Sequence, residues 1–293
     1  GAYAVPEKAP AVVTAVNRYV VADTSRSPDL LTPEVKAARK EKAPWFDASA
    51  LRSGDKKLGL GSSAAILVAS LGALVAEERG LKEDVALRSA VFDPALVAHR
   101  TAQAGGSGVD VAASFHGGTI VAVRNGSGLG VRAVELPEGL HFVVLFAGVP
   151  ASTQELVGRV RAFKARSPHE YGGVMENLTA AAEDAERAFD EGSATDLIRA
   201  LRDQLRGLTD LGEHASARIV TREVARLADL AAEEDAVVVP AGAGGGDIAL
   251  YVGAAAPSAG LLAAFDAERH VRLDVELGAR GLHLADTPSP SGV

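Results

Sequence analysis

A glycine- and serine-rich turn that opens directly into a long apolar stretch constrains this chain more than any other feature. The turn reads Lys57-Leu58-Gly59-Leu60-Gly61-Ser62-Ser63-Ala64-Ala65, and the apolar residues after it predict a helix. Gly59 and Gly61 have no side chains that would keep an anion away. The hydroxyls of Ser62 and Ser63 can cap the helix or contact a phosphate. Because the first N–H groups of a helix are unpaired and carry partial positive charge, the turn suits a di- or triphosphate, although an ordinary capped helix fits equally well.

Two further loops of small residues follow the first. The second reads Ala104-Gly105-Gly106-Ser107-Gly108-Val109-Asp110-Val111-Ala112-Ala113, and the third reads Pro240-Ala241-Gly242-Ala243-Gly244-Gly245-Gly246-Asp247. The third loop lies between stretches typical of strands, at 237–239 and 248–252. A tight hairpin needs only about two to five loop residues and rarely this much glycine. Close approach of the backbone to a ligand explains the glycine better than a surface turn does.

The composition limits the kinds of partner that such loops can serve. The 293 residues carry a net charge of −8, which argues against a nucleic-acid surface, and the absence of cysteine excludes disulfides and thiolate chemistry. The longest apolar run, 64–76, is shorter than a membrane span and contains Ser70 and Gly72. The composition therefore supports a soluble intracellular enzyme, expected in the cytoplasm, without nucleic-acid or membrane partners. The sequence does not fix whether it is a monomer or a homodimer.

Hydrophobic periodicity predicts a mixture of helices and strands. The expected strands cover 11–21, 118–123, 131–136 and 141–147, with a last strand from Val271. The expected helices cover 64–79, 82–103, 174–190, 194–211, 215–234 and 258–269. The second of these is expected to be interrupted at Pro94, and a capping box at Ser152 and Glu155 predicts a helix to about Lys164. Residues 25–43 are expected to form an irregular connection or an exposed helix, and glycine and proline near residue 140 predict a domain boundary.

The three loops resemble those of the GHMP small-molecule kinase superfamily in their order and spacing. The resemblance is to its phosphomevalonate kinase branch, through residues 56–65, through Ala98-His99-Arg100-Thr101-Ala102-Gln103 leading to 106–113, and through Asp247. Ala151-Ser152-Thr153 is a weaker similarity. The resemblance covers nearly the whole chain and implies an α+β fold of two domains. These would be an ATP-binding domain over 1–140, like domain 2 of ribosomal protein S5, and a ferredoxin-like domain over 141–293.

The resemblance also implies a reaction in which ATP, with Mg²⁺, phosphorylates 5-phosphomevalonate. Residues of the first loop are expected to bind ATP, namely Gly59, Leu60, Gly61, Ser62, Ser63 and Ala64, with the hydroxyl of Ser62 or Ser63 on the metal. Residues expected to contact the acceptor are His99, Ser107, Gly108, Ala243, Gly244 and Gly245. Relatives place an aspartate beside the acceptor where this chain has Asp110, and Lys57 can stabilise the transferring group with its charge. Asp110 and Lys57 are therefore the expected catalytic residues.

Several of these residues keep a second interpretation. Asp110 also suits the N-cap or the first turn of its helix. His99 stands where mevalonate kinases carry a metal-binding Glu, and because imidazole is a poor Mg²⁺ ligand, it is either a substrate contact or a packing histidine. Lys56 and Arg52 fit a solvated face, whereas Arg100 is a further cation near the second loop. Asp247 has no clear role, since an acid beside bound phosphate repels it unless it meets a cation or a hydroxyl.

The chain departs from the superfamily at its first motif. It begins Gly1-Ala2-Tyr3-Ala4-Val5, inside that motif, with Ala2 where many relatives carry Glu and without the preceding Gly-Lys strand. Two alternatives therefore stay open: another kinase of the superfamily, such as mevalonate kinase, or a catalytically weak protein that binds a nucleotide or metabolite. His99 and the Gly246-Asp247 ending of the third loop favour the phosphomevalonate branch over mevalonate kinase.

Overall fold

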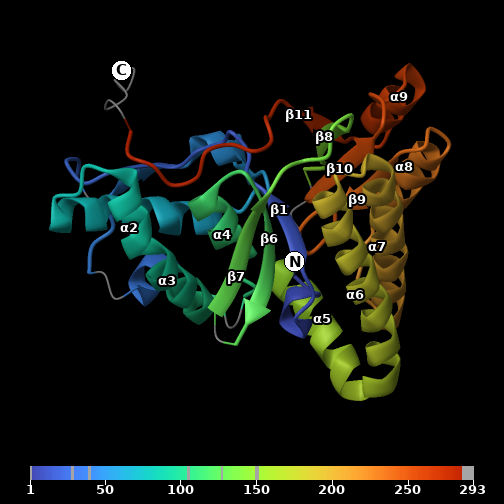
Figure 1. The fold of residues 1–293 in the computed structure, drawn as a ribbon, viewed down its shortest axis with the longest axis horizontal. Coiled ribbons are helices and arrows are strands. Elements are labelled where there is room, and N and C mark those ends of the chain that lie inside the picture. The colour runs from blue at the N-terminus through green and yellow to red at the C-terminus, as the bar shows by residue number, and fades with distance from the viewer. Residues whose placement is uncertain are drawn as a thin grey trace. The chain divides into compact units, whose positions relative to one another are not determined.

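The computed structural model describes residues 2–27, 30–38, 41–103, 106–126, 128–148 and 152–285, and has the predicted α+β fold (Figure 1). Backbone contacts divide the chain into two compact units, each assembled from separate segments. Unit 1 is drawn from Gly1–Val13, Leu51–Leu60 and Thr119–Glu276, and unit 2 from Thr14–Ala50, Gly61–Gly118 and Leu277–Val293. Gly1, Ala104, Gly105 and Ala151, which belong to motifs of the sequence analysis, lie outside the described residues.

Unit 2 is mainly helical. Its elements are β2 (Val21–Asp23), α1 (Pro33–Ala37), β3 (Trp45–Asp47), α2 (Ser62–Arg79), α3 (Asp84–Ala102) and α4 (Val109–His116). The core forms where apolar residues of α2 meet α3 and α4, including the fully buried Leu67, Val91 and Val111. The segment 277–285 completes this core: Leu282 packs so closely on α2 that a Cβ atom at Gly72 would lie 2.8 Å from its Cδ1.

Three expectations for the first part of the chain are corrected. The strand expected over 11–21 ends at Thr14, because the N–H of Ala15 already bonds to the carbonyl of Gly118, where the partner strand begins. Residues 25–43 contain the short helix α1, which is not exposed throughout, since Val35 is fully buried. α3 runs uninterrupted through Pro94, which lies on the exposed face, where water can satisfy the carbonyl group left without its usual donor.

Unit 1 holds two sheets and a set of long helices. Its strands are β1 (Ala11–Thr14), β4 (Arg52–Ser53), β5 (Lys56–Lys57), β6 (Thr119–Asn125), β7 (Gly128–Val134), β8 (His141–Phe146), β9 (Val237–Pro240), β10 (Ile248–Gly253) and β11 (Val271–Leu273). Its helices are α5 (Thr153–Arg166), α6 (Pro168–Glu191), α7 (Ala194–His214), α8 (Arg222–Ala232) and α9 (Ala259–Ala267), with short 3₁₀ turns η1 (Val5–Glu7) and η2 (Ser49–Leu51, at the border of the units). None of the helices in the described part of the chain is long and apolar enough to cross a membrane.

The sheets of unit 1 follow the predicted strands. β1, β6 and β7 form a three-stranded sheet, in which the expected hairpin pairs Thr119 with Val134. An antiparallel sheet has the order β11-β8-β10-β9, so the two strands that flank the third loop are neighbours. One core of unit 1 includes buried residues of this sheet, such as Leu145 and Tyr251, together with Leu227 of α8 and Phe265 of α9.

In the helices of unit 1 Ser152 caps α5 as predicted, although the side chain of Glu155 binds Arg159 and does not complete the capping box. α6 begins at Pro168, earlier than the predicted 174, and α8 begins later than predicted. The hydroxyl of Ser152 accepts a hydrogen bond from the N–H of Glu155 at the start of α5, and α6 and α7 pair along their length (Figure 1). The helix expected over 215–234 begins only at Arg222, because Ser216 has a left-handed backbone (φ +49°) and Thr221 caps the new start. Residues between these two form a linker that supports the third loop.

The compact units do not follow a single cut near residue 140. The hairpin of β6 and β7 belongs with the later helices because Val134 packs against a buried cluster that includes Phe189 of α6 and Leu197 of α7. The functional division into an ATP-binding domain over 1–140 and a second domain over 141–293 therefore stays a prediction.

Candidate functional site

The first loop connects a short hairpin to a long helix. β4 and β5 pair antiparallel, and the N–H of the buried Leu58 then bonds to the carbonyl of Leu51 at 3.0 Å. Gly59 and Gly61 both have a φ of +74°, a left-handed conformation that favours glycine. The predicted turn is therefore present, and it delivers the chain directly into α2.

The start of α2 differs from the prediction in its cap. Gly61 is the N-cap and no side chain caps the helix, so the expectation that Ser62 or Ser63 could cap it is wrong. The reason is that the left-handed turn at Gly61 places both serines inside the first helical turn. The N–H groups of this turn have no intrahelical acceptor, and with the helix dipole they suit an anion. Ala64 is fully buried, so only its backbone can serve a ligand.

The second loop brings α3 and α4 together at close range. Gly108 is the N-cap of α4 (φ +81°), and a Cβ atom there would lie 2.3 Å from Cδ1 of Leu96. Only glycine fits this crossing without moving Leu96. Asp110 consequently lies in the first turn of α4, with Ser107 just before the helix.

Within unit 2 the first and second loops meet at Asp110. A Cβ atom on Gly61 would lie 3.6 Å from Cβ of Asp110, so the glycine backbone stands against this side chain. Oδ1 of Asp110 accepts the N–H of Val111 at 3.0 Å and lies 3.4 Å from Nε2 of His99. The structure thus brings together the predicted residues Gly61, His99 and Asp110.

Gly59 and Lys57 belong to unit 1, where the structure groups them with Asp247. A Cβ atom on Gly59 would lie 3.0 Å from Cβ of Asp247, so the side chain of Asp247 packs directly against the backbone of the first loop at Gly59. Nζ of Lys56 donates to the carbonyl of Gly148 at 2.9 Å, whereas Lys57 is exposed. Lys56 therefore has a structural contact, and the side chain of Lys57 extends into solvent.

The third loop is held in place by backbone contacts. Gly242, Gly244 and Gly245 have positive φ values, and the N–H of Gly245 donates to the carbonyl of Ile219 at 2.9 Å. A Cβ atom on Gly244 would lie only 2.3 Å from that carbonyl oxygen. From another direction, the buried hydroxyl of Tyr3 donates to the carbonyl of Ala243 at 2.7 Å. Both neighbours restrict where the loop backbone can lie.

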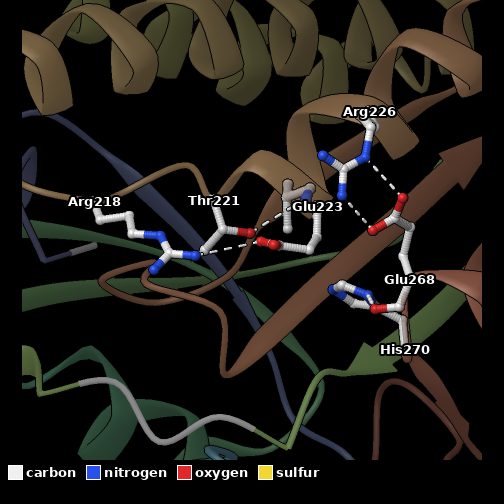
Figure 2. A network of polar contacts seen from close by, with 7 residues as sticks. Arg218, Thr221, Glu223, Arg226, Glu268 and His270 are labelled. Atoms are coloured by element: carbon white, nitrogen blue, oxygen red, sulfur yellow. Dashed lines mark hydrogen bonds and ion pairs between the residues drawn. The ribbon is translucent and has the colours of Figure 1, made fainter.

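The linker that carries Ile219 is itself fixed by a polar network (Figure 2). The hydroxyl of Thr221 accepts the N–H of Val224 at 3.3 Å, and Arg218 pairs with Glu223 at 3.7 Å. Beyond it, Arg226 binds Glu268 through two hydrogen bonds of 2.7 and 2.6 Å, which lowers the pKa of the Glu268 carboxyl. Glu223 and Arg226 both lie on α8, so these contacts hold this helix to the linker on one side and to Glu268, at the end of α9, on the other.

Tyr3 and Ile219 were not among the predicted site residues. Ile219 contributes only its carbonyl group, for which a sequence carries no signal. Tyr3 offered a weak one, since a tyrosine in an otherwise apolar segment needs a partner for its hydroxyl once it is buried.

The described residues hold no group of three or more His, Asp or Glu side chains that could cage a metal ion. Mg²⁺ does not need such a cage, because it commonly binds one or two protein oxygens together with phosphate oxygens and water. The hydroxyls of Ser62 and Ser63, in the first turn of α2, provide oxygens of that kind.

No protein-family model matches the chain. In sequence it is 32% identical over 221 residues to a phosphomevalonate kinase from Streptomyces sp. (strain CL190), which covers 68% of this chain and 58% of that protein. The chain thus spans less than two thirds of the length of this curated relative.

Solved structures share the fold over almost the entire chain. A Lin0012 protein from Listeria innocua matches with a TM-score of 0.79 and 23% identity, over 95% of this chain and 94% of that one. The Streptococcus pneumoniae phosphomevalonate kinase, solved in complex with phosphomevalonate and AMPPNP, matches with a TM-score of 0.66 and 17% identity, over 94% and 96%. At these identities the likeness shows the fold alone.

Proposed function

Because this chain belongs to the GHMP kinase superfamily, we propose that it transfers the γ-phosphoryl group of ATP to 5-phosphomevalonate and forms 5-diphosphomevalonate and ADP. The sequence similarity to a phosphomevalonate kinase supports this acceptor. The observation that carries the proposal is the position of Asp110 against Gly61, which sets a carboxylate beside a helix start suited to phosphate.

The phosphates of ATP would bind the backbone of the first loop. The residues proposed for this contact are Gly59, Leu60, Gly61, Ser62, Ser63 and Ala64. The hydroxyl of Ser62 or Ser63 would hold Mg²⁺, which neutralises phosphate charge when it is bound. Neither hydroxyl is used to cap α2, so both are available for this role.

The acceptor contacts are proposed residue by residue, as the family resemblance implies them. Ser107, Gly108 and the segment 243–245 are proposed to contact the acceptor, whereas His99 is buried and faces Asp110. Lys57 is proposed to stabilise the transferring group with its charge. An oxygen of the acceptor phosphate forms the new bond to the γ-phosphorus, while the bond from that phosphorus to ADP breaks. Because a phosphate monoester is largely ionised near neutral pH (its second pKa is about 6), no strong general base is required. Asp110 would therefore orient the acceptor rather than deprotonate it.

A coupled ADP-release assay with ATP and Mg²⁺ tests the proposal. Phosphomevalonate and mevalonate are offered separately, and an Asp110→Asn variant measures the ADP release that does not depend on the site. Turnover with phosphomevalonate alone is expected. Turnover with mevalonate alone would move the assignment to another kinase of the superfamily, and nucleotide binding by calorimetry without turnover would indicate a binding protein.

A further inference from the structure

We propose that His99 is a positioning residue that holds the carboxylate of Asp110 in the orientation required for phosphoryl transfer. The inference rests on the proposed kinase function. It is drawn from the geometry at the meeting point of α3, the second loop and α4, all of which lie in unit 2.

The pair consists of a buried imidazole and a partly exposed carboxylate. The His99 side chain is 6% exposed and that of Asp110 is 38% exposed, and Nε2 of His99 lies 3.4 Å from Oδ1 of Asp110. A carboxylate oxygen accepts hydrogen bonds only, so a hydrogen bond across this contact requires the proton of the ring to lie on Nε2. The N–H of Val111 reaches the same oxygen, Oδ1, at 3.0 Å. The imidazole of His99 and the N–H of Val111 therefore both contact Oδ1 of Asp110. Because these two contacts fix the carboxylate at Oδ1, they also restrict the direction in which Oδ2 points.

The polar contact of the His99 ring differs from those of three other histidines in the described part of the chain. His214, His270 and His283 each place Nδ1 within 2.9 Å of a carbonyl oxygen on their own segment. Nδ1 of His99 is buried and has no hydrogen-bond partner among the described residues. His116 and His270 also each leave one ring nitrogen, Nε2, buried without a partner in the described structure, so an orphaned nitrogen is not peculiar to His99. What distinguishes His99 from His270 is that its other nitrogen faces a carboxylate instead of a backbone carbonyl. The recorded polar contact of the His99 ring is with Asp110.

The second loop holds the ring against Asp110. A Cβ atom on Gly106 would lie 3.0 Å from Nε2 and 3.3 Å from Cδ2 of His99, so the loop backbone stands directly on the ring. At the end of α3, the N–H of Gln103 bonds to the carbonyl of His99 at 2.8 Å, and its side-chain amide bonds to the buried Glu34 at 2.9 Å. The ring thus has little room to move away from Asp110.

Two substitutions of His99 separate positioning from packing. His99→Leu removes the donor, and we expect kcat to fall about 30- to 100-fold while the KM for ATP stays within about threefold. His99→Gln places an amide N–H near the position of Nε2, and we expect kcat within about fivefold of the wild type. Equal kcat values for the two variants would overturn the proposal. His270→Leu is the matched control, since His270 is equally buried but lies in unit 1, and its kcat should not change.

A double-mutant cycle shows whether His99 acts through Asp110. If it does, His99→Leu combined with Asp110→Asn should have the kcat of Asp110→Asn alone, within about threefold. Gly106→Ala, which pushes on the ring without a backbone penalty, should lower kcat in the wild type and have no effect on kcat in the His99→Leu background. If the kcat losses of the two single variants multiplied in the double variant of either cycle, the proposal would be overturned. This criterion compares variants with one another, so it holds even if His99→Leu alone folds poorly.

A measurement that needs no turnover distinguishes failure of this inference from failure of the proposed function. The ¹⁵N chemical shifts of the His99 ring, assigned with His99→Gln, report which nitrogen carries the proton. We expect a proton on Nε2 and a change in its shift on Asp110→Asn, whether or not phosphomevalonate is the acceptor. A proton on Nδ1, or signals unaffected by Asp110→Asn, would overturn the contact itself.

Discussion

Tyr3 donates its hydroxyl hydrogen to the carbonyl oxygen of Ala243 at 2.7 Å, across 240 positions of the chain. The hydroxyl is buried, and burial raises the pKa of Tyr3 above its ordinary value, so the donor stays protonated at any physiological pH. A single neutral hydrogen bond therefore ties the beginning of the chain to the middle of the third loop.

Removing this donor should loosen the third loop. Tyr3→Phe leaves the Ala243 carbonyl without its partner, which costs about 1–3 kcal/mol in the free energy of unfolding. We also expect a several-fold higher KM for the acceptor, measured beside urea denaturation. Tyr251→Phe is the control, because it loses a comparable bond to the carbonyl of Ala255 outside the three loops. If both variants changed the KM equally, Tyr3 would have only a general structural role.

Two glycines of the third loop should respond differently to alanine. Gly242 and Gly244 both have left-handed backbones, but a Cβ atom on Gly242 meets nothing within 4 Å, whereas one on Gly244 lies 2.3 Å from the carbonyl oxygen of Ile219. Gly242→Ala should cost about 1–2 kcal/mol of stability from its backbone conformation alone. Gly244→Ala should cost at least about 2 kcal/mol more, because loop or linker must move, and should weaken acceptor binding. Equal melting temperatures for the two variants would contradict this.

The serines of α2 should affect metal dependence rather than folding. Because no side chain caps this helix, Ser62→Ala and Ser63→Ala should change Tm by less than about 2 °C. We expect at least one of them to raise the Mg²⁺ concentration for half-maximal rate about tenfold. Ser70→Ala, in the buried part of the same helix, serves as the control for loss of a hydroxyl. A large fall in Tm with an unchanged Mg²⁺ response would show that the serines stabilise the helix instead.

Asp110 should affect turnover far more than nucleotide binding. Asp110→Ala is expected to lower kcat at least about 100-fold, since an acceptor that is not held in line reacts slowly. Calorimetry should show nucleotide affinity within about threefold of the wild type, because the phosphates are proposed to bind the backbone of the first loop and not Asp110. An equal loss of nucleotide binding would make Asp110 a structural residue of α4.

Asp84 should contribute to the acid stability of unit 2. The N–H of Leu284 bonds to Oδ1 of Asp84 at 2.8 Å, and Arg280 pairs with the same carboxylate. The pKa of Asp84 is lowered from its ordinary value of 3.8, first by the N–H of Leu284. A carboxyl with a lower pKa in the folded state adds stability above its unfolded pKa and loses it as pH falls through the folded value.

The variant Asp84→Asn tests this. It should lower Tm at pH 7 by a few degrees, about 1 kcal/mol or less for an exposed pair, and this difference should shrink below about pH 4. Asp93→Asn, in the same helix, is the control. A Tm difference from the wild type that is constant from pH 7 to pH 3 would contradict the titration argument.

Local patterns predicted those parts of the fold that depend on neighbours in sequence. The start of α2 after Gly61, the hairpin of β6 and β7 and the cap at Ser152 follow from turn and capping chemistry within a few residues. The strand predicted beyond Thr14 failed because its length depends on where its partner begins, which alternation does not encode.

The site was predictable only in its glycine-rich backbone and its carboxylate. Gly61 and Asp110 were both expected, and the structure sets one against the other. The contacts that position the site, between His99 and Asp110 and between Ile219 and Gly245, join segments through tertiary packing. The sequence shows which residues could form such contacts, but it does not show which of them lie close together in the folded chain.

The packing of Leu282 on Gly72 sets an order on how this protein is made. A ribosome synthesises α2 long before Leu282, so unit 2 emerges with one side of its core uncovered. The nascent chain must keep that apolar surface from aggregation until residues 277–285 have been translated. A premature stop codon just before Leu277 would consequently remove the residues that cover α2 and destabilise this helix, although every residue of the first loop would still be translated.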